Sequence, residues 1–209
     1  MTSANLRKAI PIIGAISSGK SFFVDSLLGL NILESDSNIT TKFVCIIQHH
    51  KNLKEPRFYQ IELIEKDFDE NKMMIYEGNI KGNIINGYEN IKQKIKEINR
   101  MHKDIENKEV KYEELFYVLE IEIKNIENEK LLDEYDFYDI PGLDEYLGDE
   151  KKTGENLSQS EKQKEENSLK RMKYIEGLFK YFKSRIDFGV FVINAESHYA
   201  NASNKLLNT

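Results

Sequence analysis

The chain has 209 residues, of which 40% are hydrophobic, and this is enough for one domain with a buried core. Its 30 basic and 36 acidic residues give a net charge of −6, and no basic stripe of the kind that marks nucleic-acid-binding proteins occurs. No stretch approaches the roughly 18 apolar residues of a membrane span, and the only cysteine, Cys45, cannot form an internal disulfide. We therefore expect a cytoplasmic protein that does not bind nucleic acid.

The N-terminal part of the chain predicts a strand followed by a helix. Residues 8–13 form a short apolar run typical of a buried strand. Because Pro11 cannot donate to a central ladder, we expect a local irregularity there, or a strand that begins just after it. Residues 21–28 have the apolar spacing of a helix, and Gly29 follows as a C-terminal cap.

The middle of the chain combines two strands with a long polar stretch. Residues 41–47 and 58–64 are rich in β-branched and aromatic residues and predict strands. Residues 66–111 are charged and rich in asparagine. Within them, isoleucines at helical spacing predict an amphipathic helix, namely Ile91, Ile95, Ile98 and Ile105.

Strands and helices continue to alternate towards the C-terminal end. Residues 117–123 alternate between apolar and polar and predict a half-buried strand, and residues 135–139 predict a strand that runs into a Pro-Gly turn. Residues 148–168 are almost entirely polar and predict a mobile loop. Residues 169–186 predict a long amphipathic helix, and residues 188–194 a continuous apolar strand. This alternation favours a layered α/β fold.

The stretch "GAISSGKS", from Gly14 to Ser21, fits the phosphate-binding pattern G-x-x-x-x-G-K-[ST]. Its glycines let the backbone curl so that successive N–H groups point at phosphate oxygens, and the following helix adds its positive N-terminal end. In such a loop Lys20 would reach the β- and γ-phosphates, while the Ser21 hydroxyl would bind Mg²⁺. A strand predicted before the motif and a helix predicted after it support this interpretation.

A second motif, "DIPG", follows at the end of a predicted strand, from Asp139 to Gly142. In P-loop NTPases an aspartate at this place holds Mg²⁺, usually through water. The glycine leaves a backbone N–H available to the γ-phosphate. Alone the motif is an ordinary turn, but an upstream phosphate loop makes it significant.

A third element should be a threonine in the loop between these two motifs. Such a threonine closes over Mg²⁺ when the γ-phosphate is present and is released after hydrolysis. The segment offers both Thr40 and Thr41, and the local pattern does not choose between them.

Taken in order, these motifs resemble the N-terminal GTPase domain of the dynamin superfamily of large GTPases. The resemblance rests on the phosphate loop, the helix-ending Gly29, Thr41 before a basic residue and a strand, the Asp139–Gly142 motif, and residues 194–207. It implies a GTPase-type P-loop NTPase with a three-layer α/β fold and a mainly parallel sheet. That domain would span residues 1–209, with polar insertions near residues 66–111 and 148–168.

The resemblance also implies a site for GTP or GDP and Mg²⁺. The Mg²⁺ ligands would be Ser21, Thr41 and, through water, Asp139. Lys20, Thr41 and Ser17 would take part in catalysis, Ser17 near a charge-compensating cation. The nucleotide would contact Gly14, Ala15, Ile16, Ser17, Ser18, Gly19, Lys20, Ser21, Phe22, Asp139 and Gly142.

Two departures from the family pattern leave alternatives open. Ile16 stands where the family often has a glutamine that orients the attacking water, so hydrolysis could be slow. The Thr/Asn-Lys-x-Asp motif that reads guanine is missing, since the nearest imitation ends in Leu207. We therefore expect a domain cut short before its guanine-recognition strand. A nucleotide switch without useful turnover, and an ATPase, remain alternatives.

The resemblance finally implies partners that the residues themselves do not show. These are a guanine nucleotide, a second GTPase domain across the nucleotide face, and a membrane reached through segments downstream. The expected location is cytoplasmic, at the periphery of a membrane, and the expected role is in membrane remodelling or as a nucleotide switch.

Overall fold

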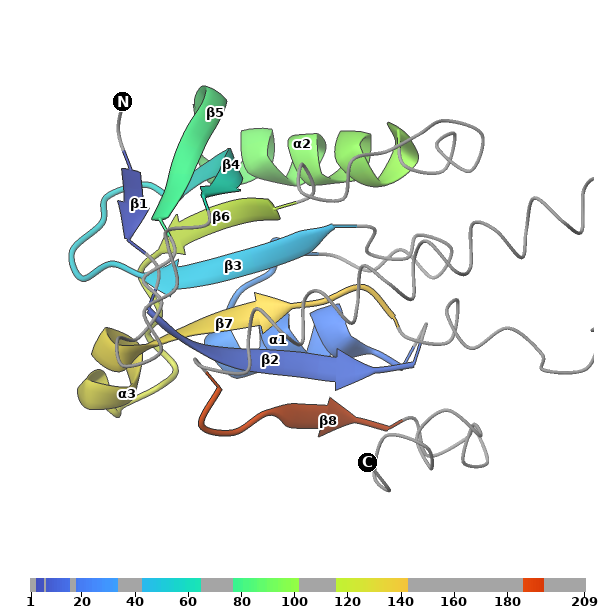
Figure 1. Ribbon diagram of the computed structural model, residues 1–209, viewed down its shortest axis with the longest axis vertical. Helices are drawn as coiled ribbons and strands as arrows, with labels where there is room; N and C mark the ends of the chain where they lie inside the picture. The colour runs from blue at the N-terminus through green and yellow to red at the C-terminus, as the bar shows by residue number, and fades with distance from the viewer. Residues whose placement is uncertain are drawn as a thin grey trace, which may run out of the picture.

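The computed structural model describes residues 3–5, 7–15, 18–33, 43–64, 77–101, 116–142 and 186–193, and Figure 1 shows how their elements are arranged. The strands are β1 (Ser3–Asn5), β2 (Lys8–Gly14), β3 (Val44–His49), β4 (Arg57–Ile64), β5 (Glu77–Asn86), β6 (Phe116–Ile121), β7 (Tyr135–Asp139) and β8 (Val190–Val192). The helices are α1 (Lys20–Leu28), α2 (Tyr88–Met101) and α3 (Glu129–Glu134).

The described strands form one sheet in the order β1-β5-β4-β6-β3-β7-β2-β8. Strand β2 lies between β7 and β8 and is parallel to both, and β3 is parallel to β6. The other pairings, β3 with β7 and those that join β6, β4, β5 and β1, are antiparallel. The sheet is thus mixed, and both neighbours of β2, the strand that leads into the phosphate loop, are parallel to it.

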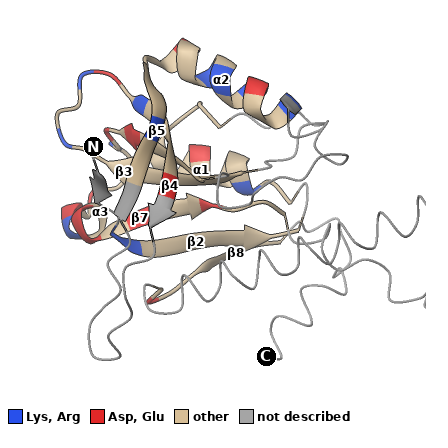
Figure 2. Ribbon diagram, turned by 45° about the horizontal axis from the view of Figure 1, so that its top comes forward, with Lys and Arg blue, Asp and Glu red and all other residues tan. Residues whose placement is uncertain are grey.

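The sheet curls strongly, as the connection from β1 to β2 requires. Six strand spacings separate β1 from β2 in the sheet order, which would place them about 29 Å apart in a flat sheet. Only two residues connect Asn5 to Lys8, and such a link spans at most about 11 Å. The β4–β5 hairpin must therefore bend back towards the start of β2, and in Figure 2 these two strands cross in front of β3 and β7.

One face of the sheet packs against α1 and α2 and holds the hydrophobic core. Helix α1 contributes Val24 and Leu28, and α2 contributes Ile91, Ile95 and Ile98, all of them buried. The sheet supplies alternate residues of its central strands, among them Ile10, Ile12, Cys45, Ile47, Phe58, Leu119 and Phe137. Burial also raises the pKa of the Cys45 thiol well above its usual value.

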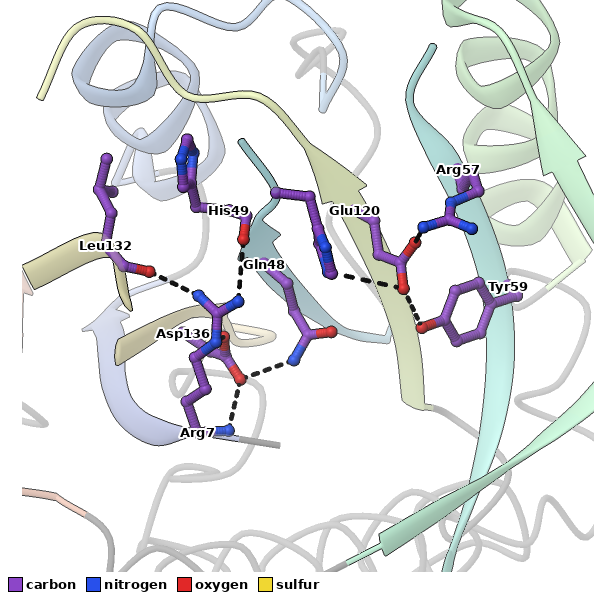
Figure 3. Close-up of polar contacts among 9 residues, drawn as sticks. Arg7, Gln48, His49, Arg57, Tyr59, Glu120, Leu132 and Asp136 are labelled. Atoms are coloured by element: carbon purple, nitrogen blue, oxygen red, sulfur yellow. Dashed lines mark hydrogen bonds and ion pairs between the residues drawn. The ribbon is translucent and has the colours of Figure 1, made fainter. Parts of the chain in front are cut away.

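The other face carries a buried polar cluster around Asp136, shown in Figure 3. Asp136 is fully buried and accepts hydrogen bonds from the Arg7 backbone N–H and the Gln48 amide, both at 2.8 Å. The Arg7 guanidinium donates to the carbonyl oxygens of Leu132 at 2.5 Å and His49 at 2.9 Å. Arg7 therefore connects the first residues of β2 to β3, α3 and β7.

A second polar cluster on this face surrounds Glu120 (Figure 3). The carboxylate accepts a hydrogen bond from the Tyr59 hydroxyl at 2.8 Å and pairs with the Arg57 guanidinium at 2.6 Å. His50 Nε2 lies 3.7 Å from the same carboxylate, and burial lowers the pKa of the His50 imidazole. These contacts compensate the charge of Glu120, which is only 9% exposed.

Most strands and helices agree with the sequence predictions, and Pro11 is the informative exception. Strand β2 runs through Pro11 without a break, and Pro11 pairs with Tyr138 of β7. On the opposite edge of β2, Ala9 forms an isolated bridge with Ile186, and the ladder with β8 starts only at Ile12. Pro11 lies opposite this gap. The expected irregularity is therefore in the pairing with β8 and not in β2 itself.

Other features differ from expectation or fall outside the described residues. Part of the polar stretch 66–111 is strand β5, which was not predicted, and the short helix α3 was not predicted either. Strand β6 is buried on both faces instead of half-buried, because Glu120 has partners on the second face. The predicted loop 148–168 and almost all of the predicted helix 169–186 lie outside the described residues.

Candidate functional site

The candidate site lies where β2 ends and α1 begins. Gly14 closes β2, and a Cβ added to it would come within 2.4 Å of the Val192 backbone oxygen and 2.8 Å of Ser18 Oγ. Gly19 caps the N-terminus of α1 with φ of 87°, a left-handed conformation that residues with a side chain rarely adopt. Glycine is therefore favoured at both positions, at Gly14 by the lack of space for a Cβ and at Gly19 by the left-handed backbone conformation.

Lys20 begins α1 and is buried at the mouth of the loop. Its Nζ donates to the carbonyl oxygens of Gly14 at 3.0 Å and Ala15 at 2.6 Å. These two bonds fold the side chain back over the loop, so that its ammonium group stays beside the N-terminus of α1. A fixed positive charge at a helix N-terminus is suited to binding an anion.

Ser21 and Asp139 meet although they are far apart in the sequence. The Ser21 hydroxyl donates a hydrogen bond of 2.7 Å to Asp139 Oδ2, and both residues are buried. Asp139 is the last residue of β7, where it lies opposite Ile12 of β2 and Cys45 of β3. The parallel pairing of β2 with β7 thus brings the ends of both strands, and the two predicted motifs, to one edge of the sheet.

The electrostatics of Asp139 indicate a site that favours a cation. Burial raises the pKa of its carboxyl to about 6, against the lowering effects of the Ser21 hydrogen bond and the Lys20 charge. Its second oxygen, Oδ1, is buried and has no hydrogen-bond partner within the described part of the chain. Carboxylate and hydroxyl oxygens are the ligands that Mg²⁺ prefers, so these residues fit the predicted Mg²⁺ site.

The remaining predicted site residues divide into three groups. Gly142 is buried three residues after Asp139, at the same edge of the sheet, and Ser18 lies in the loop with its hydroxyl buried. The Phe22 side chain is 68% exposed and points away from the buried group, which leaves only its backbone near the loop. Ile16, Ser17 and Thr41 lie outside the described residues, and their roles remain predictions.

Asp25 belongs to this region and was not singled out from the sequence. It is 7% exposed, stands one helical turn after Ser21, and acts electrostatically on both Asp139 and Cys45. An aspartate in an amphipathic helix ordinarily faces solvent. The available signal was its spacing of four residues from Ser21, which places both side chains on one face of α1.

Comparison with known proteins identifies the family. The family model described as "Dynamin family" matches residues 10–209. The chain belongs to the dynamin family. The predicted P-loop GTPase fold is thereby confirmed, and the family as a whole is one of GTPase-type hydrolases.

Other comparisons add less to this assignment. No curated protein matches the chain. Two matching solved structures come from an oligomerised bacterial dynamin pair, described as providing a mechanism for long-range sensing and tethering of membranes. They are 14% and 16% identical, with TM-scores of 0.34 and 0.33 over 97% of this chain. The chain spans about a third of their length, 34% and 33%. No helix within the described ranges is long and apolar enough to cross a membrane.

Proposed function

We propose that this domain binds GTP together with Mg²⁺ and hydrolyses the γ-phosphate. The observation that carries the proposal is the contact of Ser21 with Asp139, beside the buried Lys20 ammonium. A hydroxyl, a carboxylate and an ammonium gather at the start of a helix that follows a loop bracketed by glycines. This combination suits a triphosphate and its divalent cation.

The described residues can each be given a task in this reaction. The loop amides and the N-terminal end of α1 would bind phosphate oxygens. Lys20 would compensate the charge that develops on the β- and γ-phosphates while water attacks in line. Its bonds to Gly14 and Ala15 keep Nζ in place before the nucleotide arrives. The backbone N–H of Gly142 would meet the γ-phosphate.

Ser21 and Asp139 would hold the cation, Ser21 directly and Asp139 through water, and Thr41 would complete the ligand set. When bound, Mg²⁺ would withdraw charge from the phosphate oxygens and so lower the barrier to transfer of the γ-phosphoryl group to water. The fold already brings these two side chains together, because the Ser21 hydroxyl donates a hydrogen bond to Asp139 Oδ2.

A nucleotide switch with little turnover is the second candidate, and Ile16 favours it. An isoleucine cannot hydrogen-bond to the attacking water, so hydrolysis would depend on another group. Ser17 would keep a hydroxyl beside the phosphates, near a charge-compensating cation. We expect GTP binding in either case and slow hydrolysis in the second.

The wider role follows from family membership alone. This domain would serve membrane remodelling, would be cytoplasmic and peripheral to a membrane, and would pair with a second GTPase domain. The role, the location and the pairing are proposals, and they rest on the family and not on contacts within the described residues.

The test is phosphate release from GTP and from ATP, with Mg²⁺ and with a chelator, by the unmodified protein and by Lys20→Ala. We expect hydrolysis of GTP in preference to ATP, and a loss of at least about 100-fold in Lys20→Ala, as when other charge-stabilising groups are removed. Lys51→Ala is the matched control, because Lys51 is exposed and pairs with the exposed Glu129. It should retain full activity.

The possible results separate the candidates. Binding of GTP without turnover at saturating Mg²⁺ would support the switch. Equal use of ATP and GTP would indicate an ATPase. Unchanged phosphate release from Lys20→Ala would show that the loop is not the catalytic site.

A further inference from the structure

Asp25 holds the turn that follows α1. Its carboxylate accepts the backbone N–H of Ile32 at 3.3 Å and the backbone N–H of Leu33 at 3.0 Å and 3.2 Å. Its own carbonyl oxygen accepts the backbone N–H of Leu30 at 2.7 Å. Residues 30–33 are thus attached to the same helical turn that begins near Ser21.

The charge of Asp25 also acts on the candidate cation site. Asp25 stands one helical turn after Ser21 on the same face of α1, and both residues are buried. Four buried polar residues meet here, namely Lys20, Ser21, Asp25 and Asp139. Two carboxylates therefore share this region with a single ammonium group.

Two buried carboxylates that repel one another cost free energy until a cation arrives. A divalent cation at Ser21 and Asp139 would be attracted by both. The backbone N–H groups of Ile32 and Leu33 hold the Asp25 carboxylate in place on this side of α1.

We propose that Asp25 is a positioning residue of the Mg²⁺ site, which secures the turn after α1 and supplies a second negative charge that strengthens cation binding. The inference rests on the proposed function of the same site. It assigns to Asp25 no contact with the cation or the nucleotide. Asp25 acts through the helical turn that carries Ser21, whose hydroxyl is hydrogen-bonded to Asp139.

A purely structural Asp25 would make the same hydrogen bonds, so the test must separate charge from bonding. Asp25→Asn keeps a carbonyl oxygen that can accept from Ile32 and Leu33 but removes the charge. Glu120→Gln is the matched control, because it removes another buried carboxylate, on the opposite face of the sheet.

The first measurement is binding of a fluorescent guanine nucleotide as the Mg²⁺ concentration is varied. The half-saturating Mg²⁺ concentration should rise about 10-fold in Asp25→Asn, because a charge one helical turn away still acts strongly on a divalent ion. It should stay within twofold of the unmodified protein in Glu120→Gln. The second measurement is thermal unfolding without Mg²⁺ or nucleotide, where Asp25→Asn should stay folded and melt within a few degrees of the unmodified protein.

An unchanged half-saturating Mg²⁺ concentration in Asp25→Asn would overturn the role of Asp25, and so would an equal rise in Glu120→Gln. If Asp25→Asn does not fold, Asp25→Glu provides the comparison. Because it keeps the charge, it should stay within threefold of the unmodified protein, and a 10-fold rise would contradict the inference. An unmodified protein that binds nucleotide without regard to Mg²⁺ would reject the proposed Mg²⁺ site as well, which distinguishes the two failures.

Discussion

The hydroxyl of Ser21 donates a hydrogen bond of 2.7 Å to the carboxylate of Asp139, although the two residues stand 118 positions apart in the chain. Ser21 belongs to the first turn of α1, and Asp139 ends β7. The parallel pairing of β2 with β7 brings the two motifs together. The consequences for stability and binding can be tested at individual residues.

Asp139→Asn should remove a pH dependence of stability that has an unusual sign. Because the carboxyl has a pKa of about 6 in the folded chain and 3.8 as its ordinary value, the folded state binds the proton more tightly. This contribution therefore declines as the pH rises from 4 to 6 and is lost above that range. The free energy of unfolding of Asp139→Asn, relative to the unmodified protein, should increase by about 1 kcal/mol between pH 5 and pH 7.5.

Urea denaturation of both proteins at the two pH values measures this difference. Because other groups titrate equally in both proteins, they cancel in the comparison. A difference that does not change with pH would show that Asp139 has an ordinary pKa. The same substitution should abolish Mg²⁺-dependent hydrolysis of GTP if Asp139 holds the cation.

Gly14→Ala should destabilise the chain by about 2 kcal/mol and prevent nucleotide binding. The added Cβ would lie 2.4 Å from the Val192 backbone oxygen, which cannot move without displacing β8. Chemical denaturation and binding of a fluorescent nucleotide would show both effects. Gly189→Ala is a suitable control, because its closest contact would be Pro11 Cγ at 3.3 Å and its effect should be small.

Arg7→Ala should lower the free energy of unfolding by about 3 kcal/mol, since it removes the cationic partner of a fully buried carboxylate. It also deprives the carbonyl groups of Leu132 and His49 of a donor. Urea denaturation at pH 7 measures the loss. Lys51→Ala, which breaks only an exposed pair with Glu129, should leave the midpoint unchanged, and an equal loss there would argue against a special role for Arg7.

Gly29→Ala should lower the free energy of unfolding for two separable reasons. Gly29 has φ of 65°, and an added Cβ would meet the Asn125 side chain at 2.4 Å. We expect a loss of about 2–3 kcal/mol, of which about 1 kcal/mol comes from the backbone conformation. The double substitution Gly29→Ala with Asn125→Ala should recover the steric part, and strictly additive losses would contradict this explanation.

Much of the candidate site could be predicted from local patterns. The spacing from Gly14 to Ser21 is specific because each residue type has a physical task in holding phosphate. Asp139 became identifiable because an apolar strand ends at it. The sequence could not show that Ser21 and Asp139 touch, since this depends on the pairing of Ile12 with Asp139 across β2 and β7.

The features that were missed depend on tertiary partners. Strand β5 contains glycines and asparagines that disfavour strands, and its register against β4 shifts between Phe58 and Gln60, which breaks the alternation of its apolar residues. Glu120 resembles a solvent-facing residue of an alternating strand until Arg57 and Tyr59 are seen beside it. Asp25 is similar, because only its burial and its hydrogen bonds to the turn at Ile32 and Leu33 distinguish it from a solvated helix residue.

The neighbours of β2 determine when the phosphate loop can form during synthesis. Lys8 pairs with Tyr135, and Ile12 pairs with Val190, so both partners of this strand leave the ribosome long after it. Such distant contacts slow folding, because a long loop must close before they are gained. Throughout this interval the nascent chain would expose the unpaired edges and the apolar side chains of β2. A chaperone that shields them should raise the yield of folded protein.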